Sequence, residues 1–265
     1  MAATAARIVI KSPREVELMR AAGRVVFRVL TELAGMVRPG VTTAELDARA
    51  DQLIRAAGGT ALFKGVRNQH ARLPFPACVC TSVNEQVVHG IPAPRVLVEG
   101  DIVSVDCGVR LKGYCGDAAR TYAVGTPKPA VRRLLTVTEE ALALAVREIR
   151  PGLHWSQVAR QVAACVERSG FGVVREFVGH GIGQEMHEEP KVPNYYDRRQ
   201  RDADFELRPG MTLAVEPMVT AGSPEVKFGD HTHWPVVTKD GSWAAHFEHT
   251  VAVTEDGADV LTDGR

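Results

Sequence analysis

Four carboxylates and one histidine stand in apolar stretches of this 265-residue chain, where charged groups are seldom buried. They are Asp106 and Asp117 in "DIVSVDCGVRLKGYCGDAART", Glu216 in "MTLAVEPMV", Glu248 in "HFEHTVAVT" and His180 in "FVGHGIGQEMHEEP". Any one of these acids alone would more often lie at a strand edge or on a solvent-facing side. Burying all four together is prohibitive unless they are protonated or a cation compensates their charge.

Two divalent cations would neutralise four carboxylates. Oxygen-rich ligation with one imidazole favours Mn, Fe(II) or Co over a thiolate zinc site, with Zn and Ni as further candidates. Two metals about 3.5–4 Å apart can share bridging carboxylates and activate a bridging water. These residues therefore predict a dinuclear metal centre.

The hairpin that carries Asp106 and Asp117 can pair in three ways. A two-residue turn at 111–112 would place the two acids directly opposite each other, and a turn at 112–113 would make them diagonal neighbours. Both registers leave the acids on one face, because strand side chains alternate with period two. A three-residue turn at 111–113 would put them on opposite faces and remove the shared metal site.

Composition excludes several classes of protein. Lys plus Arg and Asp plus Glu each number 32, so the formal net charge is zero, and neither nucleic acid nor a membrane is an implied partner. Five cysteines without CxxC spacing argue against a disulfide framework or a thiolate zinc site. The first residues lack the apolar core of a signal peptide, and we expect a cytoplasmic protein.

Helix signals precede and separate strand-like segments. Ser12, Pro13 and Glu15 form a predicted capping box that begins a helix ending near "RPG" at 38–40, and Thr42 with Glu45 begins a second helix. The strand candidates are 77–83, 86–89, 101–109, 114–124, 172–179, 211–219 and 245–254. Their hairpin-like pairing predicts an α/β protein of the α+β type, with antiparallel sheets and outer helices.

A repeat links the two parts of the chain. "RPGVTTAELDARADQLIRAAGG" at Arg38 returns as "RPGLHWSQVARQVAACVERSGFG" at Arg150, with an offset of 112. Coincidence remains an alternative, because helix–Pro-Gly–helix units are common. The favoured interpretation is a single domain over 1–265, with a short tail of about 1–11 and duplicated halves of about 12–125 and 126–265.

The chain strongly resembles the type I methionine aminopeptidases, whose pita-bread fold is shared with aminopeptidase P and prolidase. The motifs that carry this resemblance are "TSVNEQVVHGIP" (81–92), "DIVSVDCGV" (101–109), "GYCGDAART" (113–121), "GHGIGQEMHEEP" (179–190), "VEPMV" (215–219) and "FEHTVAVT" (247–254). The resemblance implies a pita-bread fold of two halves related by a pseudo-two-fold axis.

The resemblance also implies roles for individual residues. The five metal ligands would be Asp106, Asp117, His180, Glu216 and Glu248, with Asp117 and Glu248 bridging two ions. Asp106 would complete one metal site, and His180 with Glu216 the other. Glu216 would shuttle a proton. His187 and His89 would contact the carbonyl oxygen and the amide nitrogen of the scissile bond without binding metal.

The implied substrate is the N-terminal methionine of peptides and nascent polypeptides with a small second residue. Phe75, Cys80, Met186 and Trp234 would line the methionine pocket, although many relatives carry an aromatic residue at the position of Met186. We also expect a monomer with transient ribosome contact. The alternatives are another metal-dependent or Xaa-Pro aminopeptidase and a non-catalytic pita-bread binding protein.

Overall fold

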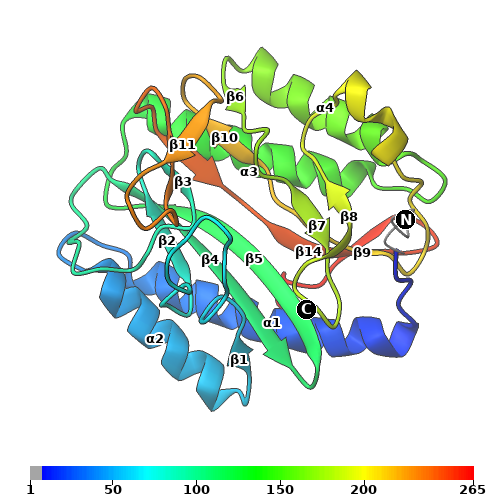
Figure 1. Cartoon of the computed structure of the whole chain (residues 1–265), viewed down its shortest axis with the longest axis horizontal. Coiled ribbons are helices and arrows are strands. Elements are labelled where there is room, and N and C mark those ends of the chain that lie inside the picture. The colour runs from blue at the N-terminus through cyan, green and yellow to red at the C-terminus, as the bar shows by residue number, and fades with distance from the viewer. Residues whose placement is uncertain (1–7) are drawn as a thin grey trace.

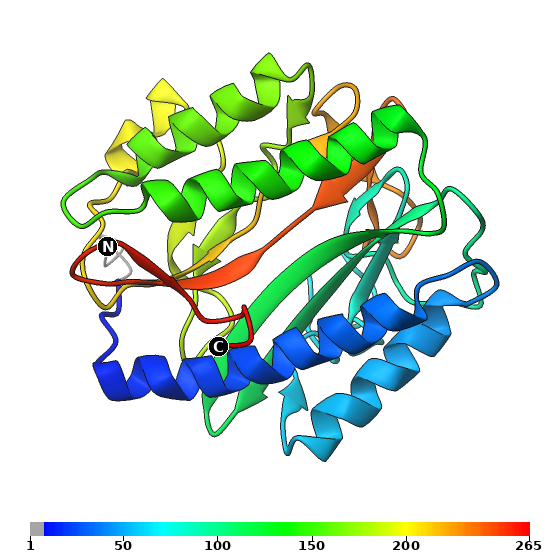
Figure 2. The ribbon, with the colours of Figure 1, turned by 180° about the vertical axis from the view of Figure 1, so that it is seen from behind.

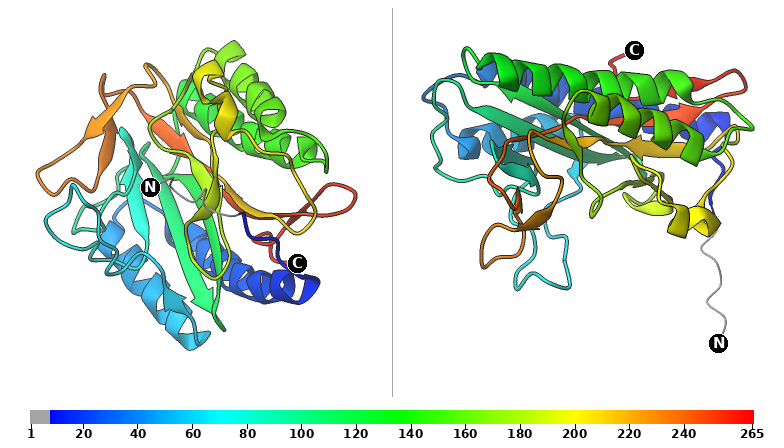
Figure 3. Two further views of the ribbon diagram at one scale, coloured as in Figure 1. Left: turned by 45° about the vertical axis from the view of Figure 1, so that its right-hand side comes forward. Right: turned by 90° about the horizontal axis from the view of Figure 1, so that it is seen from above.

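The computed structural model describes residues 8–265, so most of the tail predicted at 1–11 lies outside the described residues. Four long helices lie on one side of the strands, and loops and short hairpins extend from the other side (Figure 2, Figure 3). This arrangement of antiparallel strands and outer helices is the one that the sequence predicted. Among residues 8–265, none of the helices has the combination of length and hydrophobicity that a membrane-spanning segment needs.

The four long helices form two consecutive pairs. They are α1 (Pro13–Met36), α2 (Thr43–Ala56), α3 (Pro129–Glu148) and α4 (Trp155–Arg168). Both predicted capping boxes are present, since the side chains of Ser12 and Glu15 cap α1 and those of Thr42 and Glu45 cap α2. A short 3-10 helix, η1, spans Arg198–Ala203.

The second helix of each pair has the same bounds after a shift of 112 residues. Each is followed by a glycine with positive φ, Gly58 at 73° and Gly170 at 80°. The loops before these helices are also alike, because the N–H of Leu97 donates to Val41 and that of Leu207 donates to Leu153, both at 2.8 Å. These similarities support an internal duplication, which stays a prediction.

The strands form four sheets, and every pairing between named strands is antiparallel within residues 8–265. The first sheet contains β1 (Thr60–Ala61), β2 (Cys80–Val83), β4 (Ile102–Leu111) and β5 (Tyr114–Ala123). The second contains β6 (Gly172–Val173), β10 (Met218–Thr220) and β13 (Ala244–His246). The third contains β3 (Gln86–Val88), β11 (Val226–Phe228) and β12 (Val236–Thr238). The fourth contains β7 (Gly179–Gly181), β8 (Glu188–Val192), β9 (Thr212–Val215), β14 (His249–Val253) and β15 (Ala258–Val260).

The β4–β5 hairpin adopts the second of the three predicted registers. Leu111 pairs with Tyr114, which leaves Lys112 and Gly113 as the turn, with φ of 51° and 84°. Positive φ at both turn positions is the type I′ requirement, and glycine meets it without strain. Asp106 therefore lies opposite Ala119 and diagonal to Asp117, on the same face.

Two predicted strands are interrupted at the acids that they carry. The segment 211–219 divides into β9 and β10 at Glu216 and Pro217, where proline cannot donate to a ladder. The segment 245–254 divides into β13 and β14 at Glu248. The predicted strand 172–179 is wrong for most of its length, because only its first two residues form β6 and its last begins β7.

Two large apolar cores flank the strands that carry the acids. One lies between the α1–α2 pair and the β4–β5 hairpin, and the other lies between the α3–α4 pair and the strands β9 and β14. Figure 1 shows β5 and β14 meeting near the middle of the molecule, between the two helix pairs. The acids therefore lie where the two parts of the fold meet.

Candidate metal centre

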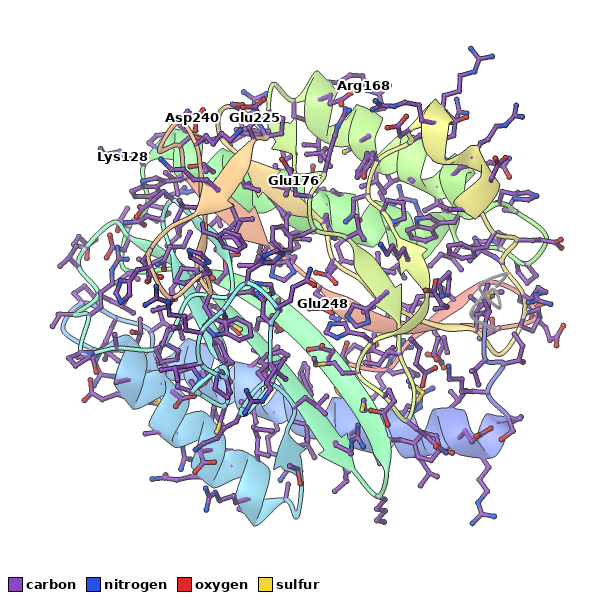
Figure 4. The ribbon with its side chains drawn as sticks, viewed as in Figure 1. Lys128, Arg168, Glu176, Glu225, Asp240 and Glu248 are labelled. Atoms are coloured by element: carbon purple, nitrogen blue, oxygen red, sulfur yellow. The ribbon has the colours of Figure 1, made fainter. Side chains whose placement is uncertain are left out.

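A cavity of about 760 Å³ opens between the two parts of the fold. It is lined by all five predicted metal ligands, Asp106, Asp117, His180, Glu216 and Glu248, and by His89, His187 and His246. Figure 4 places Glu248 near the centre of the molecule, whereas the labelled Lys128 and Arg168 lie at its periphery. Segments more than 140 residues apart in the sequence thus meet around one space.

The ligand atoms in this cavity are close enough to share metal ions. One atom each of Asp117, His180 and Glu248 lie within 4.8 Å of one another, and Glu216, His246 and Glu248 form a second such group. Nε2 of His180 lies 3.6 Å from Oε1 of Glu216. Asp106 is outside both groups, but its charge interacts directly with Asp117 and Glu216.

The tautomer of His180 follows from one hydrogen bond. Its Nδ1 lies 2.8 Å from the carbonyl oxygen of Gly181. A carbonyl oxygen only accepts, so Nδ1 carries the ring proton. Nε2, which faces Glu216, is left with a free lone pair, and this is the arrangement that a metal-binding imidazole requires.

Hydrogen bonds between β5 and the segment that begins β14 hold two of the acids in position. The N–H of Asp117 donates to Oγ1 of Thr250 at 2.9 Å, and this hydroxyl donates to the carbonyl of Asp117 at 2.8 Å. The N–H of Glu248 donates to the carbonyl of Ala119 at 2.9 Å. Glu216 is held from another side, because the buried amide of Asn194 donates to its carbonyl. The interruptions of the strands at Glu216 and Glu248 are thus stabilised by hydrogen bonds to residues distant in the sequence.

Burial dominates the electrostatics of the acids. It raises the pKa values of Asp117 and Glu216 to about 8. Burial, followed by repulsion from Asp117, raises the pKa values of Asp106 and Glu248 well above the usual range. One carboxylate oxygen each of Asp106 and Asp117 is buried without a hydrogen-bond partner. The protein alone therefore compensates these charges poorly.

The neighbouring imidazoles cannot supply the missing positive charge. Burial lowers the pKa values of His89 and His180 to about 4 and that of His246 to about 3, so all three are neutral at pH 7. Within residues 8–265, no lysine or arginine forms an ion pair with any of the four acids. Carboxylates with neutral imidazoles fit divalent cations as the compensating charge.

His246 is a residue of the cavity that the sequence analysis missed. It is only 1% exposed, and its Nε2 lies 3.6 Å from Oε2 of Glu216 and 3.9 Å from Oε2 of Glu248. The sequence could have indicated this residue, because His246 precedes Glu248 by two positions in the predicted strand 245–254. Such spacing puts both side chains on one face.

The other two predicted histidines lie on the wall of the same cavity. The ring centroid of His187 lies 4.3 Å from that of His180 in an edge-on arrangement. The ring of His89 lies edge-on to Phe177 and Trp234, at centroid distances of 5.5 and 6.3 Å. Neither belongs to the two groups of close ligand atoms, so both can face a bound molecule.

The predicted pocket residues form one apolar cluster beside the acids. Phe75, Cys80, Met186 and Trp234 pack together, and Phe75 meets Trp234 edge-on at 5.2 Å. Cys80 is directly opposite Asp106 in the β2–β4 pairing, which places this apolar wall next to the acids. The long loop 65–77 is anchored here, because Nε1 of Trp234 donates to the carbonyl of Leu73 at 2.9 Å.

The fold and this cavity define the class: a pita-bread metallopeptidase with a buried acid-rich centre. The chain belongs to metallopeptidase family M24, whose sequence model matches residues 17–255.

Its relatives include methionine aminopeptidase 1 of Bacillus subtilis, 46% identical over 96% of this chain and 99% of the relative. A methionine aminopeptidase of Clostridium acetobutylicum is 47% identical over 96% of this chain and 98% of its own. The crystal structure of methionine aminopeptidase from Thermotoga maritima matches with a TM-score of 0.90 and 41% identity, covering 97% of this chain and 99% of that one.

Proposed function

We propose that this protein is a methionine aminopeptidase, which hydrolyses the peptide bond after an N-terminal methionine. The observation that carries this proposal is the adjacency of two surfaces in one cavity, the acid cluster and the apolar wall of Phe75, Cys80, Met186 and Trp234. An apolar pocket holds a thioether side chain, and it places the following peptide bond beside the acids. The full-length similarity to methionine aminopeptidases supports the same activity.

The metal-binding residues in this proposal are Asp106, Asp117, His180, Glu216 and Glu248. Asp117 and Glu248 would each hold both ions; Asp117 lies in β5, and Glu248 immediately precedes β14. When bound, two divalent ions would supply an activated water and polarise the scissile carbonyl. Co, Mn and Fe(II) are the candidates, with Zn and Ni next, because the donors are mainly oxygen with imidazole.

The chain's own groups then orient the substrate and move protons. Neutral His187 donates its ring N–H to the oxygen of the scissile carbonyl as negative charge develops there. His89, also neutral, contacts the amide nitrogen of the same bond. Glu216 carries the proton from the attacking water toward the leaving amine, because its carboxylate lines the cavity beside the place of the scissile bond.

The proposal also covers the natural substrate, the location of the enzyme, its oligomeric state and its partners. The substrate is the initiator methionine of nascent chains with a small second residue, and the enzyme is a cytoplasmic monomer in transient contact with the ribosome. The single-domain organisation with halves at about 12–125 and 126–265 belongs to the same proposal.

Hydrolysis of defined peptides tests the function. Metal-stripped protein is reloaded with Mn, Co or Fe(II) and given Met-Ala-Ser, Met-Leu-Ser and Ala-Pro-Ser under identical conditions. We expect rapid release of methionine from Met-Ala-Ser, much slower release from Met-Leu-Ser, and no cleavage of Ala-Pro-Ser. Preferential cleavage of Ala-Pro-Ser would instead identify an Xaa-Pro aminopeptidase. Two bound ions with no cleavage of any peptide would favour a binding protein.

A further inference from the structure

His246 is placed among the acids by the same contacts that join the two parts of the fold. It ends β13, opposite Met218 of β10. Its N–H donates to Oγ1 of Thr121 at 2.9 Å, and this hydroxyl donates back to the carbonyl of His246 at 2.8 Å. The side chain is 1% exposed, so a neighbour within the cavity has to satisfy its ring nitrogens.

The contacts of Nε2 do not correspond to hydrogen bonds. This atom is buried without a hydrogen-bond partner, although it lies 3.6 Å from Oε2 of Glu216 and 3.9 Å from Oε2 of Glu248. Hydrogen bonds between such atoms are about 2.7–3.2 Å long. The separations therefore leave a buried nitrogen facing two carboxylate oxygens at more than hydrogen-bond distance.

Those separations suit donor atoms that share a metal ion. Two ligands about 2.1 Å from one ion, at an angle of 109–120°, lie about 3.4–3.6 Å apart. Nε2 of His180, a ligand implied by the family resemblance, lies at the same 3.6 Å from the other oxygen of Glu216. Glu216 thus has one imidazole facing each of its two oxygens, Oε1 toward His180 and Oε2 toward His246.

We propose that His246 binds metal through Nε2, together with Glu216 and Glu248, as the second imidazole of the centre. This inference rests on the proposed metallopeptidase function. A second imidazole makes the donor set richer in nitrogen. Imidazole suits Zn and Fe where carboxylate suits Mn, and the affinity of such sites rises from Mn to Co. The centre of this protein therefore selects Co(II) or Zn(II) over Mn(II) more strongly than a one-imidazole set would.

Counting bound imidazoles in the Co(II)-loaded protein tests the proposal directly. A histidine bound through Nε2 keeps an exchangeable Nδ1–H, whose proton NMR signal the paramagnetic ion shifts strongly. We expect two such signals in the wild-type protein and one in His246→Gln. His249→Gln is the matched control, because it removes another imidazole next to Glu248 whose Nδ1 contacts Thr262 instead. The control should keep both signals.

Metal affinity provides a second readout that a purely structural role would not produce. By calorimetry, His246→Gln should weaken Co(II) binding by at least about tenfold while weakening Mn(II) binding by clearly less. A single shifted signal in the wild-type protein, or an equal loss of affinity for both ions, overturns the proposal. Those outcomes leave the proposed function intact if two ions bind. A protein that binds no metal at all would instead end the proposed function itself.

Discussion

Metal binding should release protons from the buried acids, and the number of protons can be worked out from the structure. The pKa values of Asp117 and Glu216 are about 8 in the metal-free cavity. A group with this pKa is about nine-tenths protonated at pH 7, so these two acids alone would release about 1.8 protons when ions bind to their carboxylates. Asp106 and Glu248, whose pKa values are also raised, add to this number.

Calorimetric titration of the metal-free protein with Mn(II), in buffers of different ionisation enthalpy, measures this release. We expect close to two protons or more at pH 7, fewer at pH 9, and at least about 0.9 fewer at pH 7 for Glu216→Gln, because Glu216 also raises the pKa of Asp117. The exposed acid in Glu225→Gln is the control, and its loss should change nothing. Release of less than about half a proton at pH 7 would refute the reasoning, because the acids would then be ionised without metal.

The raised pKa values of these acids also make the stability of the metal-free protein depend on pH. An acid with a raised pKa in the folded state stabilises that state fully at low pH, below the unfolded values of about 4. This contribution is lost as the pH rises through about 8, the folded-state pKa of Asp117 and Glu216. The melting temperature of the metal-free protein should therefore fall as the pH rises from about 4 to about 8. Added Mn(II) should restore it. At 100 times the Kd, restoration amounts to about 2.7 kcal/mol, or roughly 5–10 °C.

Three further predictions concern substitutions. Asp106→Asn and Glu216→Gln should each reduce kcat on Met-Ala-Ser to below about a tenth of the wild-type value, because each removes an anionic ligand. More activity than this would contradict the assigned roles. His89→Ala should lower the rate while metal content, measured by elemental analysis, stays at two ions; metal loss would make His89 a ligand. Gly23→Ala should lower the free energy of unfolding, because the added Cβ would lie 2.0 Å from a backbone oxygen of the C-terminal segment. In the same helix, a Cβ at Gly35 would meet nothing within 4 Å, so Gly35→Ala should raise the free energy of unfolding by about 0.5–1 kcal/mol. Chemical denaturation measures both changes. A similar gain in the two variants would disprove the close contact at Gly23.

Local sequence rules predicted the parts of the fold that local chemistry decides. The capping residues Ser12 and Thr42 begin their helices as expected, since capping depends on residues within one turn. The β4–β5 turn at Lys112 and Gly113 was one of three registers left open. Period-two alternation shows that only the turns at 111–112 and 112–113 leave both acids on one face. The structure then identified the turn as 112–113.

Long-range contacts explain what was missed. Glu216 and Glu248 were expected inside continuous strands, because apolar residues flank both. Their strands stop there since Pro217 lacks a donor and the N–H of Glu248 bonds across to Ala119. The position of His246 also depends on partners far away in the sequence, such as Thr121. A pattern within one segment does not contain that information.

The spacing of the proposed metal-binding acids along the chain has a consequence for biosynthesis. Glu248 follows Asp106 by 142 residues, and the cavity needs both. At 5–20 residues per second, about 7–28 s pass between the synthesis of these two acids. During that interval Asp106 and Asp117 have no opposing strand β14 to complete their surroundings. A ribosome-bound fragment that stops before Glu248 therefore cannot cleave its neighbours, and peptidase activity begins only once the late strands have been translated and folded.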